Sequence, residues 1–119
     1  MSAVLRQKRS FSVKHFEPGD IRMGYILLPV GYAYNNDIAS AKKGDKVRFF
    51  DGGSYPIESV RRIDSTKPEA DLLCRIRYGI PIKAAKMRWR ENLRLEGHGP
   101  SAISDTECLW VVYQIESDE

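Results

Sequence analysis

Residues that build metal sites, disulfide frameworks and membrane anchors are scarce in this sequence. It contains two cysteines and two histidines among 119 residues. Cys74 and Cys108 lie far apart and outside any CxxC pair, so zinc-ligand spacings are absent and we expect two buried, reduced thiols. No apolar run approaches the roughly 18 residues that cross a bilayer, and the N-terminus lacks the apolar core of a signal peptide. These absences predict a cytoplasmic protein that uses no metal and no cofactor.

The motifs of common catalytic and phosphate-binding sites are missing as well. The sequence has no HExxH, no nucleophile elbow and no Ser/His/Asp signature. Gly52-Gly53 is not followed by GxxxxGK[ST] or GxGxxG, so it predicts a hairpin turn. We interpret His15 as a strand residue and His98, between two glycines, as a turn residue, because neither has a carboxylate or nucleophile at a local spacing. No catalytic residue is assigned, and a noncatalytic role is favoured.

The stretch around which the rest of the chain is organised covers residues 44–64. Alternating apolar and charged residues predict two strands, and the glycine-rich residues 51–53 predict the turn between them. In the second strand Ile57, Val60 and Ile63 cannot share one face of a regular strand. A bulge between Ile57 and Val60 would restore the alternation that places these apolar side chains on one face. Such bulges are common where small barrels bend.

Further apolar segments predict strands before and after this hairpin. We expect strands at residues 10–16, 23–28 and 108–115, the last of them central because it is apolar on both faces. The residues expected to face inward from the first strand and from the hairpin are Phe11, Val13, Val47 and Phe49.

Capping residues predict three helices. The first is a short helix, capped by Asn35 or Asn36, that runs through Lys43. The second begins after a Ser65-Thr66 cap and ends at Gly79. The third covers residues 81–95. The residues expected to face inward are Ile38 and Ala41 from the first helix, Leu72, Leu73 and Ile76 from the second, and Ile82, Ala85, Trp89 and Leu93 from the third.

Basic side chains are the best functional candidates. The hairpin contributes Lys46, Arg48, Arg61 and Arg62, and one face of the third helix contributes Lys83, Lys86, Arg90 and Arg94. If helix and hairpin meet along one groove, these groups form an electropositive surface for phosphates, with Tyr55 or Tyr78 as candidates to stack on a base. The alternative is a solvated basic face whose methylenes cover the edge of the core.

The distribution of charge suggests how the chain is divided. The formal net charge is +3; residues 1–15 hold four basic and no acidic residues, whereas residues 98–119 hold five acidic residues and no lysine or arginine. We expect a flexible basic arm at residues 1–9, a single domain at residues 10–116 and an acidic tail at residues 117–119.

The phrase KKGDKVRFFDGGSYPIESVRRI, followed by LLCRIRYGI and a terminal ECLWVVYQI, resembles the PUA-like barrel superfamily and, within it, the ASCH domains. The resemblance covers residues 10 to 116 and implies an α+β fold: a small mixed or antiparallel β-barrel with about three helices. It also implies RNA binding, recognition of modified nucleobases or, as in a few members, hydrolysis of modified nucleosides. The Gly-x-Lys-x-x-Glu-x-Arg segment usual in ASCH proteins is absent, so no catalytic lysine is carried over.

These patterns give three functional hypotheses. The leading one is a noncatalytic module that binds RNA or a nucleotide-containing ligand through the basic groove. The second is a small hydrolase of modified nucleosides, which needs a lysine or acidic group with a perturbed pKa in a cleft. The third is a protein-interaction module from a phage or mobile element, whose basic arm and acidic tail pair with other chains.

Overall fold

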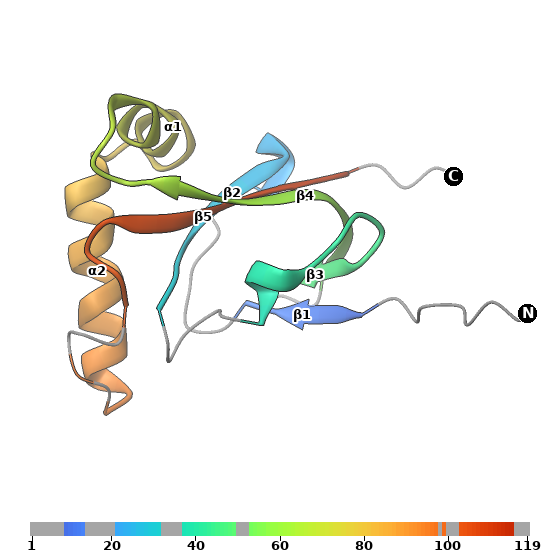
Figure 1. Ribbon diagram of the computed structural model, residues 1–119, viewed down its shortest axis with the longest axis horizontal. Helices are drawn as coiled ribbons and strands as arrows, with labels where there is room; N and C mark the ends of the chain where they lie inside the picture. Colours follow the sequence, from blue (N-terminus) through green and yellow to red (C-terminus); the bar gives the residue numbers. More distant parts are fainter. Residues whose placement is uncertain are drawn as a thin grey trace, which may run out of the picture.

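Strand β4, Ser54–Asp64, links the two halves of the fold in this computed structural model (Figure 1). The structure describes residues 9–13, 21–31, 37–49, 53–97, 99 and 103–115. In that part of the chain five strands form a mixed sheet in the order β1-β3-β4-β5-β2, and two α-helices pack beside it. The other strands are β1 (Ser10–Ser12), β2 (Tyr25–Pro29), β3 (Lys46–Arg48) and β5 (Glu107–Tyr113). The helices are α1 (Pro68–Tyr78) and α2 (Ile82–Leu95), with 3₁₀ turns η1 (Ile21–Met23) and η2 (Ile38–Ser40). The α+β class predicted from the sequence is therefore confirmed.

The bulge predicted in β4 is present. Ile57 pairs with Tyr113, but the next pair is Ser59 with Val112, so the register shifts between these two positions. Because one residue is skipped, Ile57 and Val60 point to the same face of the sheet. Ile63 points to the opposite face, and both it and Ile57 are buried. The sheet therefore carries apolar residues on both faces.

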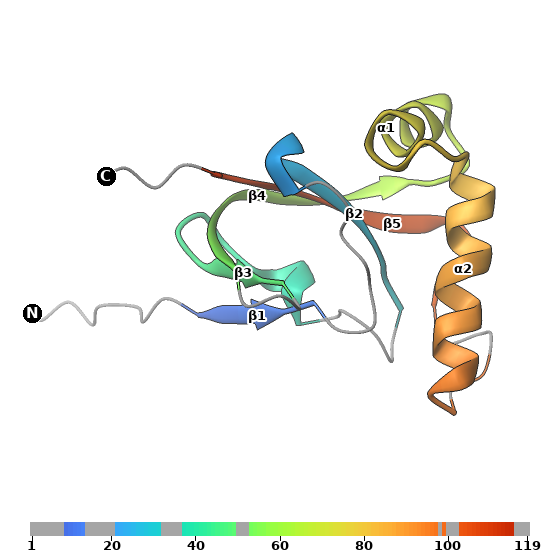
Figure 2. The same ribbon diagram turned by 180° about the vertical axis from the view of Figure 1, so that it is seen from behind.

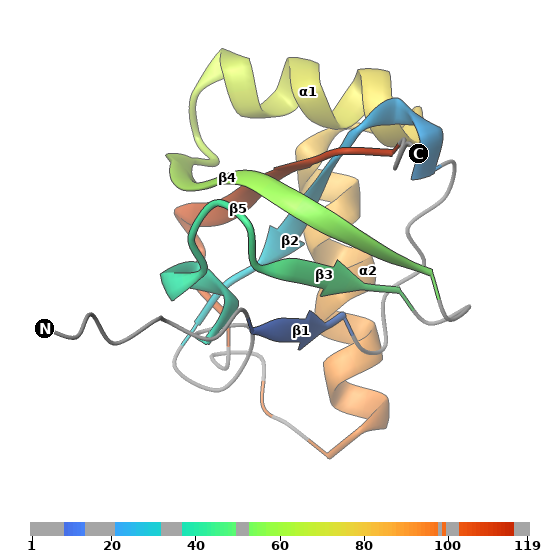
Figure 3. The same cartoon turned by 90° about the vertical axis from the view of Figure 1, so that its right-hand side faces the viewer.

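Strand β3 is positioned by a buried carboxylate. The Asp45 side chain accepts hydrogen bonds from the backbone N–H groups of Arg9 (3.0 Å) and Lys42 (2.9 Å). Val47 in β3 is buried, and β3 pairs in parallel with β1 (Figure 3). The inward positions predicted for Phe11, Val13, Val47 and Phe49 are confirmed. Arg9 is the last residue of the expected basic arm, and residues 1–8 of that arm lie outside the described residues.

The sheet is open rather than closed into the predicted barrel. Its edge strands, β1 and β2, are not paired with each other in the described residues. Side chains of α1 cover the outer edge of β2: Arg77 Nε donates to the Tyr25 carbonyl oxygen at 2.6 Å. The Tyr78 hydroxyl accepts from the Leu27 N–H at 3.1 Å and donates to the Leu27 carbonyl at 3.0 Å. These bonds satisfy backbone groups that another strand would otherwise satisfy.

Helix α1 buries a different stripe from the one predicted. Ala70, Cys74 and Arg77 are buried, whereas Leu72 and Ile76 are 58% and 55% exposed. The predicted inward role of Leu72 and Ile76 is wrong because the face of α1 that carries Arg77 is the one that reaches β2. The helix begins after Lys67 rather than after the expected Ser65-Thr66 cap. It ends as predicted at Gly79, which adopts a left-handed φ of 75°.

The other two predicted helices have different outcomes. In α2 the apolar residues Ile82, Ala85, Trp89 and Leu93 are buried, as predicted. The prediction of a short helix capped by Asn35 or Asn36 is wrong, because the described residues there form only the 3₁₀ turn η2. Asp37 caps this turn by accepting from the Ile38 N–H at 2.9 Å, and Ile38 is buried. Asn35 and Asn36 lie outside the described residues. The structure therefore has two α-helices in its described part rather than about three.

Both cysteines are free and buried, as predicted. Burial raises the pKa of the Cys74 thiol to about 11 and that of the Cys108 thiol to about 12. Neither described α-helix is long and apolar enough to cross a membrane.

Candidate functional site

The eight basic residues singled out in the sequence fall into three groups. Four are exposed and form no ion pair with a described residue, three are paired with carboxylates, and one is buried. The first group is Lys46, Arg48, Arg61 and Lys83, the second is Arg62, Arg90 and Arg94, and the third is Lys86. Unpaired cations are the ones whose charge is available to a phosphate, so this grouping changes which residues we regard as ligand contacts.

The hairpin cations lie on the outer face of the sheet. Lys46 and Arg48 flank the buried Val47, so they point away from the core. In β4, Val60 pairs with Val111 on the inner face, and the next residue, Arg61, points outward. Because Val47 and Val60 belong to the same face, which we call the inner face, the three exposed cations share the opposite, outer face, which also carries the buried Ile63.

Arg61 lies against an aromatic ring. Its guanidinium carbon is 5.4 Å from the ring centroid of Trp110, which is the residue paired with it across β4 and β5. Trp110 is only partly buried and also packs edge-on against Tyr25, with centroids 6.3 Å apart. A cation held over an indole gives a flat surface that carries both charge and a π-face. The sequence predicts a phosphate role for Arg61 but has no local signal that pairs this residue with Trp110.

Carboxylates neutralise three of the predicted contacts. Arg62 Nη1 lies 3.3 Å from Glu107 Oε1, and Arg94 Nη2 lies 2.5 Å from Glu91 Oε2. Arg90 forms an ion pair with Asp105, in the segment that leads into β5. Exposed pairs of this kind stabilise a fold by only about 0–1 kcal/mol, but a phosphate would have to compete with each carboxylate.

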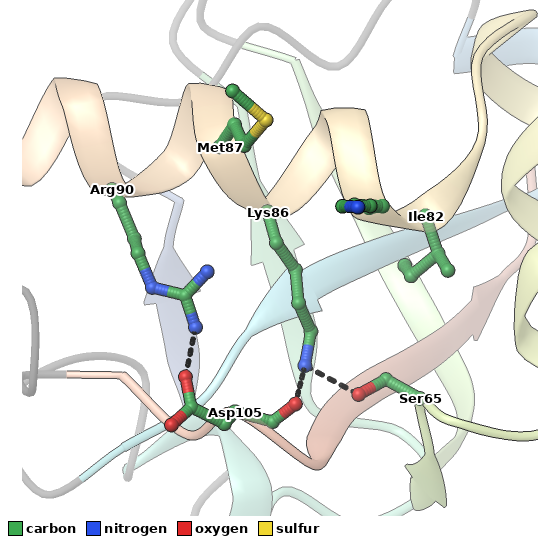
Figure 4. Close-up of a pocket in the computed structure, with 7 residues that line it drawn as sticks. Ser65, Ile82, Lys86, Met87, Arg90 and Asp105 are labelled. Carbon is green, nitrogen blue, oxygen red and sulfur yellow. Dashed lines mark hydrogen bonds and ion pairs between the residues drawn. The ribbon is translucent and has the colours of Figure 1, made fainter.

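A pocket of about 320 Å³ lies beside α2 (Figure 4). The helix contributes the larger part of its lining, and the segments that follow β4 and precede β5 supply the rest. The lining residues are Ser65, Ile82, Lys83, Lys86, Met87, Arg90 and Asp105. Of the eight predicted contacts, this pocket brings together Lys83, Lys86 and Arg90.

Lys86 is the buried member of this group, with 7% of the residue exposed. Its ammonium nitrogen is hydrogen-bonded to Ser65 Oγ and lies 2.5 Å from the Asp105 carbonyl and 3.4 Å from the Ser104 carbonyl (Figure 4). Burial lowers the pKa of Lys86, and the charge of Arg90 acts in the same direction. Lys86 is therefore buried beside the exposed residues of its helix, and its contact with nucleic acid stays a prediction.

The hairpin and α2 do not form one groove in the described residues. Figures 1 and 2 show α2 across one end of the sheet, with β3 well separated from it. The lining of the pocket includes none of Lys46, Arg48, Arg61 and Arg62. The hairpin and the helix therefore present two separate basic surfaces.

The two tyrosines expected to stack on a base have contacts within the fold. Tyr55 packs against Phe49 and Tyr113, with ring centroids 5.7 and 5.6 Å apart. The hydroxyl of Tyr78 is bonded to the backbone of Leu27, and its ring lies 5.1 Å from the Arg77 guanidinium carbon. A stacking role for Tyr55 and Tyr78 stays a prediction.

His15 and His98 lie outside the described residues. Within the described ranges, no cluster of three or more His, Cys, Asp or Glu side chains could hold a metal ion. Comparisons of the chain with protein-family models, with curated proteins and with solved structures give no match.

Ser65 and Asp105 are site residues that the sequence analysis missed. Ser65 looked like a helix cap, and Asp105 was one acid among several near the end of the chain. No local pattern joins them to α2, because their proximity to Lys86 and Arg90 depends on how the helix crosses the end of the sheet.

Proposed function

We propose that this domain binds RNA or a nucleotide-containing ligand through the outer face of its hairpin. The observation that carries the proposal is that Lys46, Arg48 and Arg61 share this face, are exposed and form no ion pair among the described residues. Exposed cations of this kind can contact phosphates, while the partly exposed Trp110 beside Arg61 offers a ring for a base. The resemblance of the sequence to the PUA-like superfamily supports the same ligand class.

The proposal predicts how strongly salt weakens binding. On a single strand each neutralised phosphate contributes about −0.7 to the slope of log affinity against log salt. Three contacts give a slope of about −2, which corresponds to a loss of roughly twentyfold between about 50 and 200 mM salt.

Fluorescence anisotropy tests this surface directly. We would titrate labelled single-stranded RNA, hairpin RNA and matched DNA at both salt concentrations with the wild type and with the double variant Arg48→Glu/Arg61→Glu. The matched control is Lys67→Glu/Arg88→Glu, which reverses two exposed charges outside the hairpin and gives the same net charge. Reversal at the hairpin is expected to abolish measurable binding, whereas the control keeps the salt slope of the wild type.

Two results would contradict the proposal. A folded wild type that binds none of the oligonucleotides at low salt has no such function. If both double variants lose affinity equally, net charge rather than the hairpin face governs binding.

A further inference from the structure

A hydroxyl group and an amine meet in the lining of the α2 pocket, away from the hairpin surface. Ser65 follows β4, Lys86 lies on α2, and Figure 4 shows the amine directed at the hydroxyl. Ser65 Oγ and Lys86 Nζ are within hydrogen-bonding distance. A hydroxyl beside a basic nitrogen is the arrangement that nucleophilic catalysis requires, and serine–lysine pairs perform it in other folds.

The three partners of Lys86 are oxygen atoms that accept hydrogen bonds from its Nζ, and a general base would have to lose one of these three donors. A neutral amine has two N–H donors and one lone pair. The carbonyl oxygens of Ser104 and Asp105 accept the two donors, at 3.4 and 2.5 Å, which leaves the lone pair for the hydroxyl of Ser65. In the neutral form the hydroxyl of Ser65 would donate to Nζ, which reverses the bond that Nζ donates to Ser65 Oγ in the charged form.

The surroundings of Lys86 both lower and raise the pKa of its amine. Burial and the guanidinium of Arg90 lower the pKa of the amine, whereas the carboxylates of Asp105 and Asp64 and the thiol of Cys108 raise it. Burial is the largest of these effects, and it favours the neutral amine that a general base must be. The Ser65 backbone is fixed by its N–H, which donates to the Thr106 carbonyl at 2.8 Å.

We propose that Ser65 and Lys86 are the nucleophile and general base of a hydrolase site for small carboxylic esters or amides. Ser65 Oγ attacks the carbonyl carbon while Lys86 Nζ takes its proton, and the tetrahedral intermediate forms. The bond to the leaving alcohol or amine then breaks, and Lys86 returns the proton to that group. Water then attacks the acyl-serine while Lys86 takes one of its protons; the bond between the acyl carbon and Ser65 Oγ breaks, Lys86 gives the proton to Oγ, and the carboxylic acid leaves.

The rest of the lining indicates the class of substrate. Ile82 and Met87 give the pocket an apolar side for a small acyl group, and Lys83 brings a positive charge to the same lining. That charge can stabilise the oxyanion of the intermediate. At about 320 Å³ the pocket accommodates a small molecule rather than a polypeptide.

An activity-based probe tests the pair without knowledge of the natural substrate. A fluorophosphonate reacts with an activated serine: the serine oxygen bonds to phosphorus, fluoride leaves, and the base takes the proton. We expect the wild type to be labelled, with the adduct mapped to Ser65 by mass spectrometry. Hydrolysis of p-nitrophenyl acetate, followed in parallel, reports turnover.

Three variants make the experiment decisive. Ser65→Ala is expected to abolish labelling, and Lys86→Met to slow it by about 100-fold, the usual effect of removing a general base. The control is Ser54→Ala, which removes an exposed hydroxyl on β4 far along the strand from the site. Circular dichroism establishes that each variant is folded. For the wild type, the labelling rate should rise with pH through the lowered pKa of Lys86, below the ordinary value of 10.5.

Each contrary result overturns the proposal. If the folded wild type is not labelled at alkaline pH, the pair is only a structural contact. If Ser65→Ala is still labelled, another residue reacts, and if Lys86→Met reacts like the wild type, Lys86 is not the base. These outcomes are independent of RNA binding, because the hairpin cations lie outside the pocket.

Discussion

Replacing Tyr78 by phenylalanine removes a single oxygen atom that satisfies two backbone groups at the edge of β2. The hydroxyl accepts from the Leu27 N–H and donates to the Leu27 carbonyl, at 3.1 and 3.0 Å. Each bond contributes about 1 kcal/mol net, and an N–H left buried without a partner costs about 1–3 kcal/mol. We therefore expect Tyr78→Phe to lower the free energy of unfolding by about 2–3 kcal/mol.

The chain offers a matched control for this substitution. Tyr25→Phe also removes one hydroxyl, which donates to the Leu73 carbonyl at 2.9 Å. Leu73 lies inside α1, where its carbonyl keeps its helical hydrogen bond, so no backbone group is orphaned and we expect a loss of about 1 kcal/mol or less. Urea denaturation followed by circular dichroism measures both losses. Equal losses, or a loss under about 0.5 kcal/mol for Tyr78→Phe, would refute the argument that this hydroxyl seals the edge.

Three further results are expected. Burial raises the pKa of Cys74 to about 11 and that of Cys108 to about 12, so the thiols of the unfolded chain ionise first as pH rises. The free energy of unfolding should therefore be unaffected below about pH 9 and should fall above it. Thermal melts at about pH 7–11 should show a smaller fall in a Cys74→Ala/Cys108→Ala variant. Gly79→Ala should lower the free energy of unfolding by about 1 kcal/mol through left-handed backbone strain alone, because an added Cβ meets no atom within 4 Å. Gly79→Asn should lower it by less, and urea titrations measure both losses. Hydrogen bonds from Arg75 and from the Ile82 N–H lower the pKa of the Asp71 carboxylate, so it contributes stability that is lost as pH falls through its folded pKa. The melting temperatures of the wild type and of Asp71→Asn should therefore differ at about pH 7 and converge below about pH 3. A difference that stays constant with pH would contradict this.

Local patterns were enough to predict much of the fold. The bulge in β4 followed from parity, since Ile57 and Val60 could share a face only if one residue were skipped. Gly79 ended α1 because a left-handed residue is needed there. The buried stripe of α1 could not be predicted from apolar content, because Arg77 faces inward to bond the edge of β2 while Ile76 remains exposed. The same contacts occupy the strand edge that a barrel would have used.

The candidate site was harder to predict than the fold. Helical spacing placed Lys83, Lys86 and Arg90 on one face, and the structure gathers them around one pocket. It could not indicate that Lys86 would be buried or that Asp105 would neutralise Arg90, because both depend on segments distant in sequence. Pairing partners, rather than basic residue types, decide whether the charge of a cation is already neutralised within the fold.

The position of β5 in the sheet has a consequence for how the protein is made. This strand is the last described element to be synthesised, yet it lies between β4 and β2 and pairs Tyr25 with Val112. Until it has been translated, β2 and β4 have no common neighbour in the sheet. Pairing over such a separation in sequence is slow because the intervening loop must close first. The β1-β3-β4 part of the sheet needs no later segment, whereas β2 can join it only after β5 has been translated.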